Sequence, residues 1–452
     1  MENSENSTDP GLSTAVGHRR LLALAVPIVL ANLTQPILSA VDTGIAGHLP
    51  GAASLGGVAL GGLFFNFVVW GFGFLRMGTT GFVAQAEGAR DWSGLRLTLL
   101  RALVLAAAIG AALLALRLPL IALALDLLGG SDAVREQATF YCRARIWSAP
   151  ATLGNYVVLG YLLGRQRVRL GLLLQIAINL VNVVLAVLFV FGFGWGVAGI
   201  GAATAGADWA GLALGAVLLR RLRHRALAPV RWPEVLERRA LFRLLAVNRD
   251  IFIRTSCLVA SFGWFAHIGA RLGDTILAAN ALLLNFQSFM AFGLDGFAHA
   301  AEALVGAAIG AGDGAALRRA IRLSLGWAFG CAAAFSVFYL LLGSAIIDLL
   351  TDQPVIRAAA TLYLPWAVLS PFISVWGFQL DGVYIGATRT RALRDSMALA
   401  AAGFVAATLI LEPAFGDHGL WASLMILMIL RGTTLGWWLG RISVDPVRGR
   451  NE

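Results

Sequence analysis

Charged residues are scarce in this chain of 452 residues, of which 13% are charged and 58% are hydrophobic. Soluble domains carry about 25% charged residues, so a soluble fold would lack the polar surface that its helices need. Apolar runs of about 18–25 residues recur along the whole length, and such runs are typical of membrane-spanning helices. The composition therefore predicts an all-α polytopic membrane protein.

Lysine is absent, so all 35 basic residues are arginines, and only three cysteines occur. Cys142, Cys257 and Cys331 lie far apart without metal-ligand spacing, so we expect no disulfide framework. The net charge of +10 comes from arginines in short connections, which favours membrane orientation over nucleic-acid binding. The chain has no P-loop, HExxH motif or nucleophile elbow. We expect no enzymatic activity, no cofactor, and an ion gradient as the energy source.

Twelve hydrophobic segments predict twelve membrane-spanning helices. They lie at 20–48, 55–87, 95–118, 135–163, 168–192, 197–220, 240–270, 274–308, 317–345, 357–386, 391–412 and 418–440. The arginine-rich connections between them lie at 18–20, 165–169, 220–225, 238–239, 318–319 and 389–394. The opposite set of connections is nearly free of arginine, so the positive-inside rule predicts that both termini are cytoplasmic.

The two halves of the chain are related by an internal repeat. GARD (88–91) matches GAGD (310–313) at an offset of 222 residues, and the same offset relates Tyr141 to Tyr363. Because each half has six segments, both halves start on the same side, which predicts two parallel six-helix lobes. The predicted domains are a tail (1–19), a first lobe (20–220), a basic linker (221–240), a second lobe (241–440) and a tail (441–452).

The first segment contains one carboxylate, Asp42, in the stretch QPILSAVDTGIAG. A charge at the bilayer centre costs roughly 3 kcal/mol, so such residues face a cavity, pair, or change protonation. Gln35 shares its helix face, while Pro27 and Pro36 interrupt the backbone hydrogen bonds and predict a bend. A carboxylate hydrogen-bonded for packing alone is the alternative; we favour one that binds a proton or cation.

Further polar residues follow in the fifth and sixth segments. Gln175, Asn179 and Asn182 fall at i, i+4 and i+7, and Thr204 and Asp208 lie at i and i+4, so each set shares a helix face. Together with Asp42 they form a candidate site for a proton or sodium ion. Hydrogen bonding between helices, a common use of amides in membranes, is the alternative.

The second half carries different polar chemistry. Its candidate network comprises Arg254, Asn280, Asp295, His299, Glu302, Asp381 and Arg431. Asp295, His299 and Glu302 share one helix face, at i, i+4 and i+7. Arg431 needs an anion, for which we predict Asp295. A structural network is as consistent with this pattern as a role in transport.

With these residues in view, the chain resembles the multidrug and toxic compound extrusion (MATE) family, in particular its DinF-like branch. The segments that carry the resemblance are PILSAVDTGIAGHL (36–49), 178–204, NRDIFIRT (248–255), 270–286, GLDGFAHAAEALVG (293–306) and DGVYIGATRTRALRDSM (381–397). The resemblance implies twelve helices in two lobes around a V-shaped central cleft. It also implies export of amphipathic, mostly cationic drugs or toxic metabolites in exchange for H⁺ or Na⁺, by a monomer in the bacterial inner membrane.

The resemblance also assigns roles to single residues. Asp42 matches the family's first-helix aspartate, whose protonation is linked to bending at a proline that matches Pro27. The polar positions around that site match Gln35, Asn182 and Thr204. A second aspartate, frequent in the family one turn after Asn182, is Ala186 in this chain. Losing an oxygen ligand weakens a sodium site more than a proton site, so we favour H⁺.

The expected function is therefore proton-coupled drug antiport. Three alternatives stay open: a sodium-coupled drug antiporter, a flippase for lipids or lipid-linked precursors, and a membrane scaffold without transport activity. Asp208 stays a candidate replacement for the carboxylate that is missing at Ala186.

Overall fold

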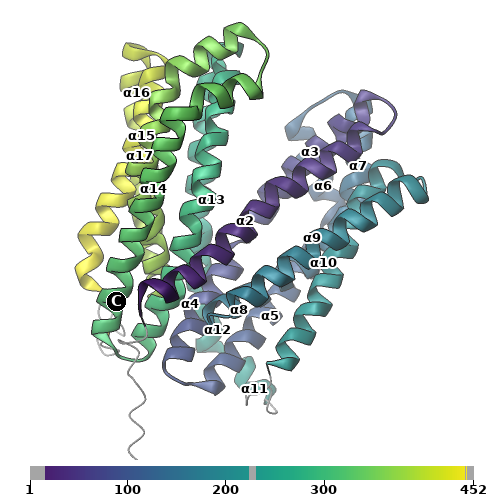
Figure 1. Ribbon diagram of the computed structural model, residues 1–452. Coiled ribbons are helices and arrows are strands. Elements are labelled where there is room, and N and C mark those ends of the chain that lie inside the picture. The colour runs from purple at the N-terminus through teal and green to yellow at the C-terminus, as the bar shows by residue number, and fades with distance from the viewer. Residues whose placement is uncertain (1–15, 223–230, 443, 445–452) are drawn as a thin grey trace, which may run out of the picture. The chain divides into compact units, whose positions relative to one another are not determined.

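The computed structural model describes residues 16–222, 231–442 and 444, and every element among them is helical. The first half contains α2 (His18–Gly47), α3 (Ala52–Gly71), α4 (Phe74–Gly88), α5 (Trp92–Ala115), α6 (Arg117–Leu128), α7 (Asp132–Arg145), η1 (Ile146–Ser148), α8 (Ala149–Gly164), α9 (Val168–Val187), η2 (Leu188–Gly192) and α10 (Gly196–Arg221). The second half contains α11 (Trp232–Val235), α12 (Arg238–Arg271), α13 (Asp274–Gly310), α14 (Gly314–Leu350), α15 (Pro354–Gly386), α16 (Thr390–Phe415), α17 (Asp417–Trp438) and η3 (Leu439–Arg441) (Figure 1).

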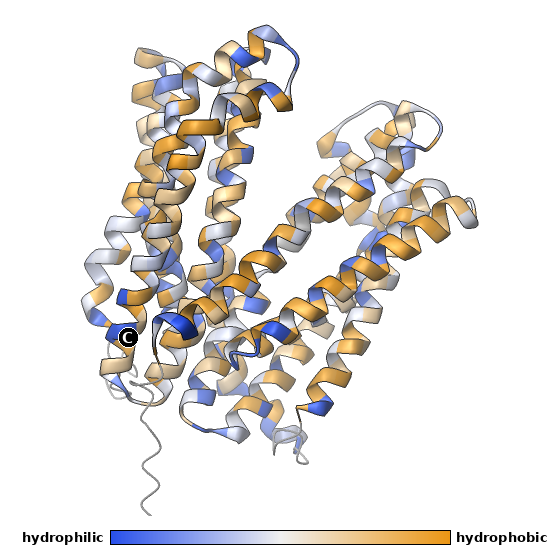
Figure 2. Ribbon diagram, in the orientation of Figure 1, coloured by the Kyte–Doolittle hydropathy of each residue, from blue (hydrophilic) through white to orange (hydrophobic). Residues whose placement is uncertain are grey.

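All twelve predicted segments are helical, and ten described helices are long and apolar enough to cross a membrane. Several segments are interrupted, among them 55–87, which divides into α3 and α4, and 135–163, which divides into α7, η1 and α8. The sequence did not predict α6, a short helix between the third and fourth segments. Hydrophilic residues gather towards the ends of the long helices and their connections (Figure 2), as expected for helices that cross lipid.

The chain forms two compact units. One comprises Met1–Val29, Ala84–Arg90 and Ile253–Glu452, and the other comprises Leu30–Val83 and Asp91–Phe252. Helix α2 therefore contributes its first part to one unit and the rest to the other, with the division two residues after Pro27. The domain boundaries drawn from the linker stay a prediction, and residues 1–15 and 223–230 of the predicted tail and linker lie outside the described residues.

The internal repeat is visible in the backbone. Left-handed backbone conformations recur at an offset of 222 residues, in the pairs Gly51 and Gly273, Arg90 and Gly312, Gln166 and Thr388, and Gly194 and Gly416. The helix starts repeat as well. The Asp91 carboxylate accepts the backbone N–H of Gly94, and the Asp313 carboxylate accepts those of Ala315 and Ala316, as N-capping residues do. Corresponding turns in the two halves therefore share left-handed residues, and in one pair of turns also an N-capping aspartate, at equivalent positions.

Two glycines allow α4 and α13 to approach at a crossing in the unit that contains residues 253–452. A Cβ atom on Gly88 would collide with the carbonyl oxygen of Ala307, and one on Gly310 with that of Gln85. The pairs are reciprocal, because Gly310 and Ala307 are the repeat counterparts of Gly88 and Gln85. The Gln85 side chain also donates to the carbonyl oxygen of Gly386 at 2.9 Å, which ties this crossing to α15.

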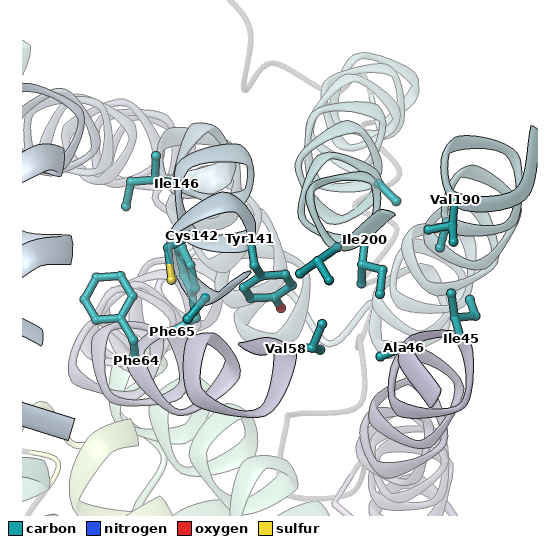
Figure 3. Packing of buried hydrophobic residues seen from close by; sticks show 14 of the residues in the cluster. Ile45, Ala46, Val58, Phe64, Phe65, Tyr141, Cys142, Ile146, Val190 and Ile200 are labelled. Atoms are coloured by element: carbon teal, nitrogen blue, oxygen red, sulfur yellow. The ribbon is translucent and has the colours of Figure 1, made fainter. Parts of the chain in front are cut away.

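The other unit has an apolar cluster around α7. Its members come from α2, α3, α6, α7, η1, α9, η2 and α10, among them Ile45, Ala46, Val58, Tyr141, Ala186, Val190 and Ile200. The Tyr141 ring reaches towards Val58 and Ile200 (Figure 3). A Cβ atom on Gly201 would collide with the Tyr141 backbone and lie 3.1 Å from the Arg145 nitrogen. Glycine at 201 thus lets α10 approach α7 closely.

We expect Gly310→Val to destabilise the protein, because the added side chain meets the Gln85 backbone at the crossing. Overpacking of this kind costs about 1–3 kcal/mol. The melting temperature of purified protein in detergent measures the effect. Gly330→Val is the control, since a Cβ atom there meets nothing within 4 Å. Equal melting temperatures for the two variants would contradict the proposed role of the crossing.

Candidate functional site

The Asp42 carboxylate lies in the second half of α2. The residue is half-buried, and its Oδ1 atom is buried without a hydrogen-bond partner among the described residues. Two contacts position this part of α2 against α9. Asn179 donates to the Thr34 hydroxyl at 2.8 Å, and Ile45 and Ala46 share the apolar cluster with residues of α9. Along α2, Asp42 therefore lies between the polar contact at Thr34 and the apolar contacts of Ile45 and Ala46.

The polar stripe on α9 forms as predicted, and it links neighbouring helices. Gln175 donates to Asn179 at 3.2 Å. Asn182, which is 1% exposed, donates to the Thr204 hydroxyl of α10 at 3.0 Å and leaves its own Oδ1 atom buried without a partner among the described residues. Ala186, one turn further, is fully buried among apolar residues. The side chain at position 186 therefore offers no oxygen to a cation.

These contacts place Asp42, Ala186 and Arg145 at one height along the helices. Helices α2 and α9 run in the same direction, so Asp42, eight residues after Thr34, lies level with residue 187, eight residues after Asn179. Ala186 packs in one cluster with Ile200 of α10, and the next residue of α10, Gly201, contacts the backbone of Arg145. The height of Arg145 is thus set by packing that does not involve its side chain.

Arg145 is the residue that sequence reasoning missed. It donates to the hydroxyl of Tyr141, one turn earlier, and its guanidinium carbon lies 4.6 Å from the centre of the Phe65 ring. It also interacts electrostatically with Asp42 and Asp208. The sequence offered no basic partner for Asp42 because Arg145 is more than 100 residues away. An arginine within segment 135–163 was the available signal.

Asp208 is held by α8 and not by the amides of α9. Its Oδ2 atom accepts from the Thr152 hydroxyl, and its backbone carbonyl accepts from Asn155 at 2.9 Å. The predicted sharing of a face with Thr204 holds on α10, but their side-chain partners differ. Asp42 and Asp208 are therefore connected through the charge of Arg145 and not through a common set of hydrogen bonds.

The predicted helix-bending prolines lie within a continuous α2, which runs through Pro27 and Pro36 from His18 to Gly47. The side chain of Gln35 lies outside those that the structure describes. The bending role of the prolines and the site role of Gln35 stay predictions.

In the other unit, the buried carboxylate of Asp381 accepts from two arginines on different helices, Arg254 of α12 and Arg431 of α17. All three side chains are less than 10% exposed. Sequence reasoning paired Arg431 with Asp295, whereas the structure joins Arg431 to Asp381. Asp295 interacts electrostatically with Arg254. Arginine cannot titrate in proteins, so this ion cluster carries fixed positive charges.

The remaining predicted residues of this unit divide into two groups. His299 lies 3.4 Å from the fully buried Glu302, on the same face of α13. Asn280 belongs elsewhere: it donates to Asp417 at 2.7 Å and accepts from the Trp421 indole at 2.8 Å. The predicted single network is therefore at least two clusters. Asp417 was missed because it lies at the boundary of a predicted segment.

The repeat aligns charges of opposite sign in the two units. Within the last helix of each half the offset is 223, so that Gly196 corresponds to Gly419 and Asp208 to Arg431. The surroundings agree, since Asp208 contacts Asn155 and Arg431 contacts Gly377, which are related by the offset of 222. One position of the repeated architecture is thus acidic in one unit and basic in the other.

Residues 27–188 and 253–411 match the family model MatE. The chain is 44% identical over 421 residues to DNA damage-inducible protein F of Escherichia coli strain K12, which covers 92% of this chain and 91% of that protein. It is 27% identical over 429 residues to multidrug resistance protein MdtK of Edwardsiella ictaluri, which covers 90% and 92%.

Solved structures show the same fold. The Vibrio cholerae MATE transporter VcmN, solved as a mutant, has a TM-score of 0.85 and 19% identity and covers 97% of this chain and 99% of its own. An outward-facing multidrug resistance MATE family transporter of the MOP superfamily has a TM-score of 0.82 and 20% identity, with 96% and 98% covered. These likenesses confirm the predicted all-α membrane architecture.

We expect Asp381→Asn to destabilise the protein, because it leaves two buried arginines without their shared carboxylate. Breaking a buried pair from one side costs roughly 3–5 kcal/mol. Thermal unfolding in detergent measures the loss. Asp348→Asn is the matched control: its carboxylate is exposed and lies 3.4 Å from Arg357, and surface pairs contribute about 0–1 kcal/mol. A melting temperature for Asp381→Asn as high as that of the control would disprove the stabilising role of the cluster.

Proposed function

Because this chain belongs to the MatE family of membrane transporters, which are not enzymes, we propose that it exports amphipathic, mostly cationic compounds in exchange for protons. The observation that carries the proposal is the half-buried carboxyl group of Asp42, whose Oδ1 atom has no hydrogen-bond partner among the described residues. The relative named as a multidrug resistance protein supports drugs as the class of substrate.

The hydrogen-bonding groups around Asp42 favour a proton as the coupling ion. The Oδ1 atoms of Asp42 and of Asn182, one turn before Ala186 on α9, are buried acceptors without a partner among the described residues. A proton on a carboxyl group turns an acceptor into a donor, whereas Na⁺ requires several oxygen ligands around one point. The apolar side chain of Ala186 removes one such ligand at the height of Asp42.

In the proposed cycle, Asp42 takes a proton on the outer side and releases it on the inner side. A cationic compound binds while Asp42 is ionised and leaves when Asp42 is protonated, because the attraction between the two charges is lost. Proton and substrate therefore exclude each other, which is the requirement for exchange. The energy comes from the proton gradient.

We further propose that the protein resides in the bacterial inner membrane with both termini in the cytoplasm and works as a monomer. The clustering of arginines in one set of connections supports the orientation. Small amphipathic or cationic drugs or toxic metabolites are the proposed partners besides the lipid bilayer.

We expect Asp42→Asn to abolish transport driven by a pH gradient, because asparagine cannot take up a proton. Ethidium efflux from proteoliposomes, with ΔpH and ΔpNa imposed separately, is the measurement. Asp126→Asn is the control, since Asp126 pairs with Arg135 at an exposed position and its loss should leave transport intact.

Undiminished ΔpH-driven efflux by Asp42→Asn would refute the proposal. Efflux by the wild type that follows ΔpNa alone would support the sodium-coupled alternative. Scrambling of lipids that depends on their headgroup, without any drug efflux, would support a flippase.

For Asp208→Asn we expect ΔpH-driven efflux to persist at a reduced rate. Asparagine keeps an oxygen that accepts from Thr152, so the contact between α8 and α10 survives while one negative charge is lost. The same proteoliposome assay measures it. Complete loss of coupling, equal to that of Asp42→Asn, would mean that both carboxylates must titrate.

A further inference from the structure

We propose that Arg145 is the counterion of Asp42 and sets the pH at which Asp42 exchanges its proton. This inference rests on the proposed function, because it assumes that Asp42 takes the coupling proton. It makes Arg145 a positioning residue: the guanidinium acts on the proton-binding carboxyl group without receiving a proton itself.

Helix contacts place Arg145 level with Asp42 along the helix axes. Gly201 faces the backbone of Arg145, because a Cβ atom at position 201 would lie 3.1 Å from the Arg145 nitrogen. Seven residues further along both helices, Thr152 of α8 donates to Asp208 of α10. Helices α7, η1 and α8 therefore run in the same direction as α10 through this region. Since Asp42 lies level with residues 186–187 of α9 and these with residues 200–201 of α10, the backbones of Asp42 and Arg145 are at the same height.

The unused hydrogen-bonding atoms of the two residues are complementary. Arg145 donates through Nη1 to Tyr141, but its Nε is a buried donor without a partner among the described residues. Asp42 Oδ1 is a buried acceptor without a partner among the same residues. Leaving such groups unpaired is costly in an apolar environment. One orphan donor and one orphan acceptor at one height, with opposite charges, form a pair when either side chain rotates.

The net charge of the site is such that a single proton neutralises it. With both carboxylates ionised, Asp42, Asp208 and Arg145 sum to −1, so one proton neutralises the set.

The other ionisable groups around this site do not replace Arg145. Helix α3 carries none, and the sole ionisable residue of α9, Arg169, lies ten residues before Asn179. Arg117 and Asp126 of α6 bond to the Leu114 carbonyl oxygen and to Arg135. Besides these, α7 carries Asp132, Glu136, Tyr141, Cys142 and Arg143, α8 carries Tyr156 and Tyr161, α10 ends with Arg220 and Arg221, and α2 begins with His18, Arg19 and Arg20. Arg76 acts on Tyr156, and the ring of His48, which follows α2, bonds to the Gly44 carbonyl oxygen.

The Phe65 and Tyr141 rings offer the Arg145 guanidinium a second favourable position, away from Asp42. The guanidinium carbon lies 4.6 Å from the Phe65 ring centre and 5.6 Å from that of Tyr141, within the range of cation–π attraction. When Asp42 is ionised, the guanidinium turns to it. When a proton binds to the Asp42 carboxylate, the attraction falls and the guanidinium stays with Tyr141. Helix α7 ends at Arg145 and continues as the 3₁₀ turn η1, a feature frequent at hinges.

Ethidium binding to purified full-length protein in detergent, measured by fluorescence anisotropy over a series of pH values, tests the inference. The pH at which ethidium binding is half-maximal, called the midpoint below, reports the exchange of the proton for the cationic probe. In Arg145→Gln we expect the midpoint to rise by about one pH unit or more, because the ionised carboxylate loses its opposite charge. Arg145→Lys should restore most of the wild-type midpoint. The control is Arg135→Gln on the same helix, which should leave the midpoint unchanged.

Tyr141→Phe provides a second variant, for which we expect the midpoint to shift in the opposite direction. It removes the hydroxyl that accepts from Arg145, so the guanidinium is freer to pair with Asp42 and the midpoint should fall. A merely structural role for Arg145 would not produce opposite shifts in the two variants. An unchanged midpoint in Tyr141→Phe together with either an unchanged midpoint or misfolding in Arg145→Gln would overturn the inference.

Asp42→Asn separates the inference from the proposed function. If its ethidium binding keeps the wild-type pH dependence, Asp42 is not the exchanging group and the proposed function fails. If the pH dependence disappears in Asp42→Asn but the Arg145→Gln midpoint stays at the wild-type value, only the counterion role fails.

Discussion

A carboxylate in an apolar surrounding needs a positive charge or a proton, and the two compact units meet this need differently. Around Asp381 the charge is permanent, because two arginines from different helices hold one carboxylate. Around Asp42 one oxygen has no hydrogen-bond partner among the described residues and the nearby arginine bonds to a tyrosine. The first arrangement fixes helices, whereas the second leaves a group free to respond to the proton concentration.

The close approach of the helices depends on residues without side chains at a few crossings. Gly201 brings α10 onto α7 beside Arg145, and Gly88 and Gly310 bring the ends of α4 and α13 together. In the unit that holds Asp42, hydrogen bonds also link α10 to its neighbours, from Asn182 of α9 to the Thr204 hydroxyl and from Asn155 of α8 to the backbone carbonyl oxygen of Asp208. Close packing and polar contacts therefore both hold α10 in place.

Most of the fold could be predicted from the sequence, because apolar segments of membrane length are a local signal. All twelve segments are helical, whereas the break after Arg145 and helix α6 were not predicted. Polar stripes on single helices, such as Asn179 and Asn182, could also be predicted. Pairing between helices could not: Arg431 joins Asp381 and not Asp295, and Arg145 interacts electrostatically with Asp42 because the packing of α7, α9 and α10 brings the two residues to one height.

The opposite charges of Asp208 and Arg431, at corresponding positions of the repeat, have an evolutionary consequence. A duplicated protein starts with two equal halves, and an ionisable group retained in both would respond to pH twice. In this chain the position is acidic in one half and holds an arginine, which keeps its charge, in the other, so a response to pH at this position is confined to one half at most. The repeated backbone is therefore kept while the chemistry at this position differs, and a duplicated architecture does not require duplicated ionisable groups.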